Sequence, residues 1–334
     1  MILIDALYIN DGGGKVLLDY LMSELEKSEN DVWYLLDERI QGKAPEVKET
    51  NKVTFMKGDL MRRNSFYGSN GDQFTSVLCF GNLPPNIRLT GKVYTYFHQL
   101  LYLALPADMV FKKKILYWLK TMILNRIKNN TDFWIVQTTL VKEGLKNKYR
   151  LNPEKILELP FYPPFPETQI PAREKSTYLY VSNATPHKNH QRLINAFCRF
   201  YDQTRTGKLI LTVNEDYPEL LQFIKQIQDK NYPIENVGFV SREVLAKLYK
   251  STEYLIHPSH SESFGLGLVE AIENGCKVIG ADLPYTFAVC EPSLTFNPLK
   301  VDSIVEALSL SLQETKQSVS KVKNEIATLT NLLH

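Results

Sequence analysis

Two glutamates and the start of a helix form the most informative segment of the sequence, which runs from His257 to Pro284. Its pattern predicts strand, loop, helix and strand, with Glu262 in the loop and Glu270 eight positions later in the helix. Glu270 would lie about a turn and a half beyond the helix start, which is near 264 or 265. The two carboxylates therefore cannot serve the same purpose.

The start of this predicted helix is a candidate anion site. Ser263, Phe264 and Gly265 open it, and the N–H groups of a first helical turn have no partners within the helix. A diphosphate bound there would place Glu270 within reach of a diol such as a ribose, and Glu262 beside hydroxyls of a group beyond the phosphates. That arrangement describes a nucleotide sugar. The alternative is that the two glutamates only cap and solvate a helix.

A lysine and a histidine follow other predicted strands. Lys188 lies in the loop between a strand that ends near 181 and a helix that begins near 190, where it is well placed for phosphate. His98 follows the strand over 93–97 and is expected at its carboxyl end, facing a cleft. A solvated loop lysine and a structural histidine are the alternatives.

Several site classes are poorly supported. Gly12, Gly13 and Gly14 follow the first predicted strand but do not give the Gly-x-Gly-x-x-Gly pattern of an NAD site. The sequence has no Asp-x-Asp pair and no His/Cys cluster with zinc spacing, so we expect no metal and no cofactor. The net charge of +2, from 39 Lys and Arg against 37 Asp and Glu, gives no global field for nucleic acid.

The composition is that of a soluble globular protein with room for two domains, since 44% of the 334 residues are hydrophobic. The four cysteines are dispersed and show no Cys-x-x-Cys spacing, which favours a reducing compartment. There is no basic leader and no apolar run of roughly 18 residues. We therefore expect a cytoplasmic protein.

Alternating strand and helix patterns must position the candidate residues. Short β-rich runs predict strands at 2–9, 32–36, 53–56, 77–80, 93–97 and 133–136, and then at 177–181, 209–213, 236–240, 254–257 and 278–281. Helices fit between many of these, which predicts an α/β fold with two parallel sheets. Five prolines between 160 and 171 predict a linker. Two such domains would face each other across a ligand-binding cleft.

The segment over 238–285 resembles the family-4 retaining glycosyltransferases, whose hallmark is two glutamates separated by seven residues. Its sequence is GFVSREVLAKLYKSTEYLIHPSHSESFGLGLVEAIENGCKVIGADLPY. The resemblance implies the GT-B fold, with Rossmann-like domains over 1–165 and 172–312 and a linker at 166–171. It also implies that the last segment, 313–334, is a helix that returns to the first domain.

The same resemblance implies roles for individual residues. Glu270 would bind the ribose and Lys188 the diphosphate, where it stabilises the leaving group. Glu262 would bind the sugar, together with three backbone amides, those of Phe264, Gly265 and Leu266.

The first predicted domain receives roles in the same way. His98 would contact the transferred sugar and the acceptor, and Gly13 and Gly14 would let the substrates approach the backbone, although a plain turn explains these glycines almost as well. Retention would follow a front-face, oxocarbenium-like transition state that depends mainly on leaving-group stabilisation.

Three positions depart from the family pattern. Asn183 stands where an arginine usually helps to bind the diphosphate, and His187 is a candidate substitute. The loop over 214–216 reads Asn-Glu-Asp instead of being glycine-rich, and Ala288 stands where a glutamate is common. These departures leave the donor preference and the turnover open.

The helical stretch over 111–128 carries lysines on one arc and apolar side chains on the other. Such a helix can lie against anionic lipid headgroups, which suits an enzyme with a lipid-linked acceptor at the inner face of the membrane. The alternative is an ordinary packed helix with a basic solvent face.

The sequence therefore predicts a retaining glycosyltransferase that moves a sugar from a nucleoside diphosphate sugar to a saccharide or lipid-linked acceptor, as in bacterial surface polysaccharide synthesis. Two alternatives stay open. One is a nucleotide-sugar epimerase or hydrolase on the same fold. The other is an accessory subunit that has lost turnover, and Asn183 and Ala288 are the residues that favour this alternative.

Overall fold

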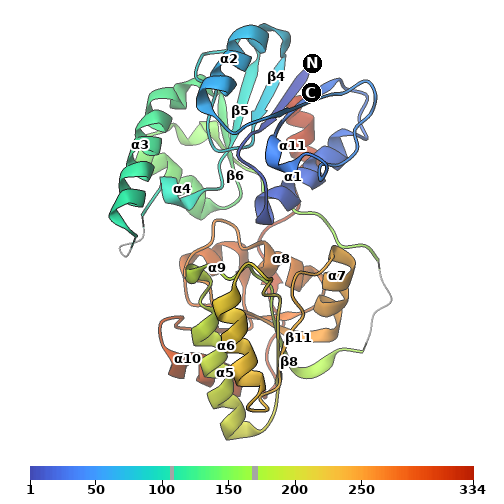
Figure 1. Cartoon of the computed structure of the whole chain (residues 1–334), viewed down its shortest axis with the longest axis vertical. Coiled ribbons are helices and arrows are strands. Elements are labelled where there is room, and N and C mark those ends of the chain that lie inside the picture. The colour runs from blue at the N-terminus through green and yellow to red at the C-terminus, as the bar shows by residue number, and fades with distance from the viewer. Residues whose placement is uncertain (106–108, 168–171) are drawn as a thin grey trace. The chain divides into compact units, whose positions relative to one another are not determined.

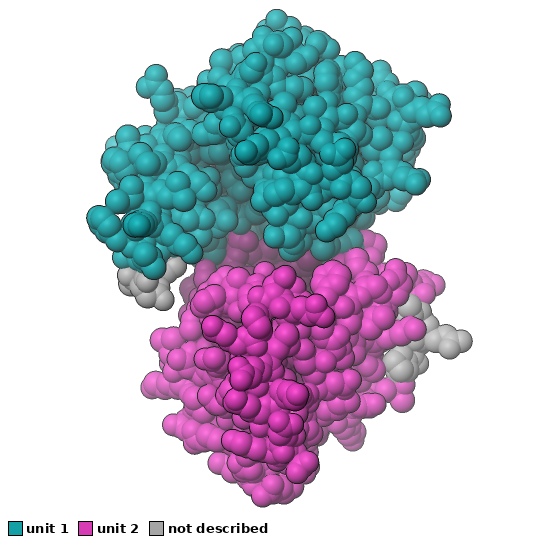
Figure 2. All heavy atoms as spheres, viewed as in Figure 1, with its two compact units in different colours: residues 1–163, 323–334 teal, residues 164–322 magenta. Residues whose placement is uncertain are grey.

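The computed structural model describes residues 1–105, 109–167 and 172–334 of the chain. They form two compact units, which Figure 2 colours separately. Unit 1 comprises Met1–Pro163 and Lys323–His334, and unit 2 comprises Pro164–Val322. The chain thus passes from one unit to the other within the proline-rich run, where the linker was predicted at 166–171; residues 168–171 lie outside the described residues.

Unit 1 is built on a parallel sheet with the strand order β3-β2-β1-β4-β5-β6-β7 (Figure 1). Its strands are β1 Ile2–Ala6, β2 Val32–Asp37, β3 Lys52–Met56, β4 Ser76–Cys79, β5 Lys92–Tyr96, β6 Phe133–Val136 and β7 Ile156–Glu158. The central strand β1 is buried along its whole length, as its apolar run requires in a sheet covered on both faces. The strand order reverses between β1 and β4, and this is where an open α/β sheet accepts a ligand at its carboxyl edge.

Helices cover this sheet and end in loops at its edges. Within the described residues they are α1 Gly12–Leu25, α2 Leu60–Asn70, α3 Phe111–Ile127, α4 Thr139–Tyr149 and α11 Ile326–Leu333. Side-chain caps fix two of the starts, because Asp59 accepts from the Arg62 N–H at 2.9 Å and Thr138 accepts from the Val141 N–H at 3.3 Å. Among the described residues, no helix is both long enough and apolar enough to cross a bilayer.

Unit 2 repeats the architecture with the strand order β10-β9-β8-β11-β12-β14. The strands are β8 Glu174–Tyr180, β9 Lys208–Leu211, β10 Ile234–Asn236, β11 Thr252–His257, β12 Lys277–Ala281 and β14 Leu294–Phe296. The helices are α5 His190–Thr204, α6 Pro218–Gln228, α7 Arg242–Ser251, α8 Leu266–Glu273, α9 Pro284–Val289 and α10 Val301–Leu310. The reversal of strand order falls between β8 and β11.

The predicted fold class, α/β with two Rossmann-like parallel sheets, is confirmed. Differences concentrate at sheet edges: β7 and β14 were not predicted, and β10 was predicted at 236–240 but spans Ile234–Asn236. Three-residue edge strands contain too few positions to show a periodic pattern. Gly238 adopts φ +69°, which places left-handed backbone inside the predicted β10.

The C-terminal prediction, a helix over 313–334, is wrong in its extent. Only Ile326–Leu333 is helical, and β15 Val319–Ser320 pairs with β13 Cys290–Glu291 in unit 2. Ser318 holds this segment there, because its hydroxyl oxygen accepts hydrogen bonds from the Val278 and Ser293 N–H groups. The return to unit 1 does occur, since the apolar face of α11 joins the unit 1 core through Leu329 and Leu333.

Candidate functional site

The carboxyl edge of the unit 2 sheet carries several of the residues that the sequence singled out. β8 and β11 are parallel neighbours, with Tyr178 in register with Tyr254. Lys188 lies in the loop after β8, and Glu262 lies in the loop after β11. The parallel register therefore brings both loops to the same edge, at the point where the strand order reverses.

Lys188 and Glu262 form an ion pair at this edge, with 2.6 Å between Nζ and Oε1. His257, the last residue of β11, lies 3.3 Å from the same carboxylate through its Nε2. Burial by itself would raise the pKa of Glu262, but the hydrogen bond from His257 and the charge of Lys188 outweigh it and hold that pKa well below its usual range. Glu262 is therefore ionised at neutral pH.

Hydrogen bonds to backbone carbonyls hold the two loops that carry this pair. The His260 N–H donates to the His187 carbonyl at 2.8 Å, and the Tyr180 hydroxyl donates to the Lys188 carbonyl at 2.8 Å. The Asn189 amide donates to the carbonyls of Pro258 and Pro298. The positions of the Lys188 and Glu262 backbones are thus fixed before any ligand binds.

The helix start after Glu262 is shaped by a glycine. Gly265 caps α8 with φ +74°, and a Cβ there would lie 3.0 Å from Leu268 Cδ1. Gly265 brings no side chain to its own helix end, Phe264 is buried, and Ser263 and Leu266 are half-buried. The predicted anion site, residues 263–266, directly follows Glu262, the carboxylate partner of Lys188, in the chain.

Glu270 is buried in α8, and both of its oxygens have partners from α7. Arg242 Nη1 donates to Oε1 at 2.9 Å, and the Tyr249 hydroxyl donates to Oε2 at 3.2 Å. Burial raises the pKa of Glu270, and Arg242 opposes that rise. The sequence prediction missed both partners. Their spacing of seven residues, two helical turns, was the available signal, because it places them on one face of α7.

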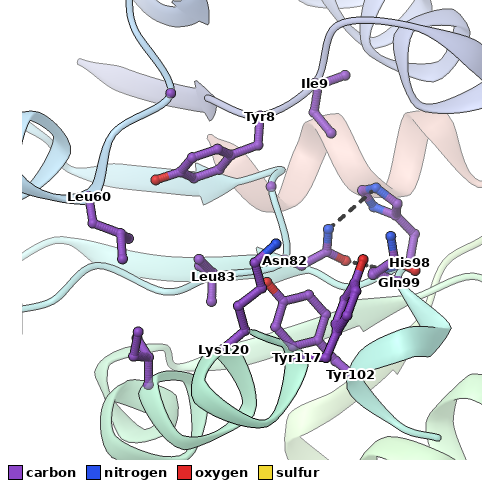
Figure 3. Close-up of a pocket in the computed structure, with 13 residues that line it drawn as sticks. Tyr8, Ile9, Leu60, Asn82, Leu83, His98, Gln99, Tyr102, Tyr117 and Lys120 are labelled. Atoms are coloured by element: carbon purple, nitrogen blue, oxygen red, sulfur yellow. Dashed lines mark hydrogen bonds between the residues drawn. The ribbon is translucent and has the colours of Figure 1, made fainter. Parts of the chain in front are cut away.

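Unit 1 contains a cavity of about 310 Å³ at the carboxyl ends of β1, β4 and β5 (Figure 3). Its lining includes the predicted residue His98 and residues that the sequence prediction missed. Among the latter are Tyr8, Asn82, Tyr102, Tyr117, Lys120 and Ile123. The cavity lies where the strand order of unit 1 reverses, as the topology requires.

His98 lies in this cavity with its side chain paired to Asn82. The side-chain oxygen Oδ1 of Asn82 accepts from the backbone N–H of His98 at 2.7 Å, so the side-chain NH₂ group of Asn82 faces His98 Nε2 at 3.4 Å. Nε2 is then the acceptor and Nδ1 carries the proton. That Nδ1 is buried and has no partner within the described residues. Burial lowers the pKa of His98 to about 4, so the imidazole is neutral at neutral pH.

Two other residues of the cavity have strained backbones. Tyr8 adopts φ +80° and Asn82 adopts φ +69°, which costs about 1–3 kcal/mol at each such position. The Tyr8 N–H donates to the Asp37 carboxylate at 3.2 Å. The residue before Asn82 is Gly81, where a Cβ would clash with the Leu7 carbonyl oxygen. Strain of this kind concentrates at binding sites. The sequence signal was the Gly81-Asn82 turn directly after a strand.

The two predicted glycines of unit 1 lie in the first turn of α1. A Cβ added to Gly14 would be 3.9 Å from His98 Nε2, so the structure brings Gly14 and His98 together. Apart from its chain neighbours and the backbone of its own helical turn, a Cβ added to Gly13 would meet no atom of the described residues within 4 Å. Glycine in a helix costs about 0.5–1 kcal/mol relative to alanine, and packing does not account for that cost at Gly13.

Two of the residues that depart from the family pattern, Asn183 and Ala288, lie in unit 2. Asn183 is exposed in the loop after β8, and its side-chain oxygen accepts from the Thr185 hydroxyl, which also lies 3.3 Å from His187 Nδ1. Ala288 lies in α9. In residues 1–105, 109–167 and 172–334, no three His, Cys, Asp or Glu side chains gather in a way that could hold a metal ion.

Comparison with known proteins connects unit 2 to one family. Residues 165–322 match the family model described as glycosyl transferases group 1, which agrees with the coarser part of the resemblance. Over 193 residues, the chain is 26% identical to the O-antigen chain mannosyltransferase RfbU of Salmonella typhimurium, covering 56% of this chain and 52% of that protein. The chain spans between 13% and 52% of the length of the curated relatives it matches.

Solved structures match over both units. Sucrose-phosphate synthase from Thermosynechococcus elongatus has a TM-score of 0.68 at 16% identity, covering 93% of this chain and 89% of that one. HepE from Anabaena, in complex with UDP and glucose, has a TM-score of 0.65 at 12% identity, covering 94% and 89%. At such identities the likeness concerns the fold alone, and it agrees with the predicted GT-B architecture.

Proposed function

We propose that this protein is a glycosyltransferase that moves a sugar from a nucleoside diphosphate sugar to a saccharide or lipid-linked saccharide acceptor, in polysaccharide synthesis. One observation carries the proposal: Lys188, Glu262, the start of α8 and Glu270 all belong to the loops and helix at the strand-order reversal of unit 2. The match of residues 165–322 to group 1 glycosyl transferases and the mannosyltransferase relative support it.

Glu270 is assigned to the ribose of the donor. Each carboxylate oxygen has two acceptor sites, and Arg242 and Tyr249 take one on each oxygen, which orients the group and leaves acceptor capacity for a diol. Nucleotide-binding α/β folds commonly recognise the ribose through a carboxylate that accepts hydrogen bonds from its hydroxyl groups. Arg242 and Tyr249 are then positioning residues for Glu270.

Lys188 and the α8 amides are assigned to the diphosphate. Bond cleavage at the anomeric carbon transfers negative charge to the departing diphosphate, and an ammonium group with helix N–H donors stabilises that charge. Glu262 holds the Lys188 ammonium at this edge and, with the amides of 264–266, would contact the sugar hydroxyls. No metal is required in this scheme. Asn183 supplies no charge where the family usually has an arginine, so either another basic residue, with His187 as the candidate, takes over that role or turnover is slow.

The unit 1 cavity is assigned to the acceptor. His98 is assigned to contact with the transferred sugar and the acceptor. His98 lines this cavity as a neutral imidazole, so its ring can contact a sugar hydroxyl there. Tyr8, Tyr102 and Tyr117 supply aromatic surface in the same cavity. Retention is proposed through a front-face, oxocarbenium-like transition state in which the acceptor enters on the side from which the diphosphate leaves.

Calorimetric titration tests the donor site. UDP, GDP, ADP, CMP and dTDP and their common sugars are titrated without metal and again with EDTA. We expect one base to bind equally in both conditions, with binding lost in Lys188→Ala and Glu270→Ala. Lys225→Ala and Glu273→Ala are the matched controls, because Lys225 is exposed on α6 and Glu273 is exposed on the same helix as Glu270.

Two further outcomes separate the alternatives. If no nucleotide binds, the donor-site assignment is wrong and the accessory-subunit alternative takes its place. If a nucleotide sugar binds, product analysis by proton NMR distinguishes a glycoside with retained configuration from free sugar or an epimerised donor.

A further inference from the structure

The apolar arc of α3 faces away from the core of unit 1. An ordinary packed helix with a basic solvent face, one of the two alternatives from sequence, would bury that arc, and the structure shows the opposite. Trp118 is 59% exposed and Met122 51%, and neighbouring side chains are similarly open. We call this surface the apolar face of α3; its residues are Phe111, Ile115, Trp118, Leu119 and Met122.

The helix contacts unit 1 through its other side. Leu124 and Ile127 are buried in the core cluster around β6, and Tyr117 packs edge-on against Tyr102 with 6.1 Å between ring centroids. Just after the helix, Lys128 Nζ donates to the Tyr149 carbonyl at 2.7 Å. These contacts fix the rotation of α3 about its axis. The apolar face is therefore presented to the surroundings of unit 1, at whose periphery Figure 1 shows α3.

The charge on α3 indicates what covers this face. The helix carries five cations and no Asp or Glu, and the cations are Lys112, Lys113, Lys114, Lys120 and Arg126. The whole chain has a net charge of only +2, so this charge is local. A second copy of the chain seated on the same face would bring ten like charges together, which is unfavourable. Apolar side chains beside exposed lysines, with a tryptophan among them, match the interface of an anionic bilayer.

We propose that the apolar face of α3 docks unit 1 on an anionic lipid bilayer. Phe111, Trp118 and their neighbours enter the headgroup region, and the exposed Lys112, Lys113 and Arg126 contact lipid phosphates. The same helix lines the unit 1 cavity with Tyr117 and Lys120, which Figure 3 labels, and also with Ile123. If the cavity takes the acceptor, a step that rests on the proposed function, docking selects an acceptor that is itself anchored in the membrane.

Sedimentation with lipid vesicles tests the docking. We expect the full chain to bind vesicles of phosphatidylcholine with phosphatidylglycerol, to bind pure phosphatidylcholine far less, and to dissociate as salt rises. Each cation near such a surface contributes about fivefold to the partition coefficient, so Lys112→Gln with Lys113→Gln should weaken binding roughly 25-fold. The matched control is Lys225→Gln with Lys230→Gln, which removes two exposed lysines of unit 2 and should leave binding unchanged.

A second pair tests the apolar part. Trp118→Ser with Leu119→Ser should abolish most vesicle binding, whereas Leu310→Ser, at an exposed apolar position on α10, should not. Circular dichroism spectra and urea unfolding midpoints equal to those of wild type show that each variant is folded. Equal binding by all variants, or binding to neutral vesicles alone, would overturn the proposal.

Trp118 also reports its own environment. The difference between the fluorescence spectra of wild type and Trp118→Phe separates the emission of Trp118 from that of Trp33 and Trp134. This difference emission should shift to shorter wavelength only with anionic vesicles. The alternative result is no shift in emission and a dimer in light scattering that the Trp118→Ser, Leu119→Ser variant does not form. That result would show that a second copy of the chain covers the apolar face of α3. Nucleotide binding is measured without vesicles, so failure of the docking and failure of the proposed function are seen separately.

Discussion

Lys188 Nζ lies 2.6 Å from Glu262 Oε1, although the two residues are 74 positions apart in the chain. The strands that precede them are neighbours in the sheet, and both side chains are mostly buried. A diphosphate that binds Lys188 must therefore share its ammonium group with Glu262. The ion pair couples the position assigned to the leaving group to the position assigned to the sugar.

Removal of Lys188 should weaken donor binding and leave the Glu262 carboxylate with its hydrogen bond to His257. In a double-mutant cycle of Lys188→Ala and Glu262→Ala, we expect a coupling free energy of about 1–2 kcal/mol in urea unfolding. Because the pKa of Glu262 is lowered by folding, its contribution to stability is present above the pKa of an unfolded glutamate and is lost as the pH falls. A coupling near zero at neutral pH would contradict this account.

Glu270→Gln should reduce nucleotide affinity roughly 10- to 150-fold, because a hydrogen bond to a charged group contributes about 1.5–3 kcal/mol. The amide is nearly isosteric, so the loss reports the charge and not the volume. Calorimetric Kd values for the variant are compared with those for Glu273→Gln on the same helix, which should bind as wild type. A wild-type Kd for Glu270→Gln would remove Glu270 from the donor site.

Gly13→Ala should change stability and activity in opposite directions. The added methyl group meets no atom of the described residues within 4 Å beyond its own helical turn, and it restricts the unfolded chain. We therefore expect a gain of about 0.4–1 kcal/mol in the free energy of unfolding. If substrate passes close to this backbone, kcat/KM for transfer should fall at the same time. Unchanged kcat/KM in the stabilised variant would show that Gly13 serves only the turn at the start of α1 and does not contact substrate.

The imidazole of His98 should make the stability of the protein depend on pH. Its folded pKa, about 4, lies below the unfolded value near 6.5, so between these values the unfolded chain binds the extra proton. Stability therefore rises with pH across this window and falls as the pH drops, by roughly 3 kcal/mol at most. His98→Gln should flatten this difference. Paired urea titrations at pH 4.5 and 7 measure it, and an identical pH dependence in the variant would show that His98 does not titrate in this way.

The sequence could predict the unit 2 site because its main residues lie close together in the chain. Glu262, Gly265 and Glu270 fall within nine positions, so a strand, a loop and a helix start already fix their order and spacing. Lys188 could be placed because parallel strands send their loops to one edge. Arg242 and Tyr249 were missed, since their contact with Glu270 depends on how α7 packs against α8.

The unit 1 cavity was harder to predict for a similar reason. His98 was identified by its place after a strand, but Tyr8 and Asn82 come from two other loops, and their left-handed backbones leave no periodic signal. Tyr102 and Tyr117 enter the cavity from segments that the sequence pattern treats as ordinary helix and loop. Only the packing of these segments on one sheet brings them together.

The sequence by itself determined the two α/β units and the candidate residues at the carboxyl ends of the strands, because apolar periodicity and turn residues act locally. The return of the C-terminal end to unit 1 was implied only by the family resemblance. The tertiary structure decided which side chains pair, as for Lys188 with Glu262 and Arg242 with Glu270, and which face of α3 remains uncovered. Periodicity shows that a helix has two faces, but the contacts that cover one of them come from residues distant in the chain, and only packing selects among them.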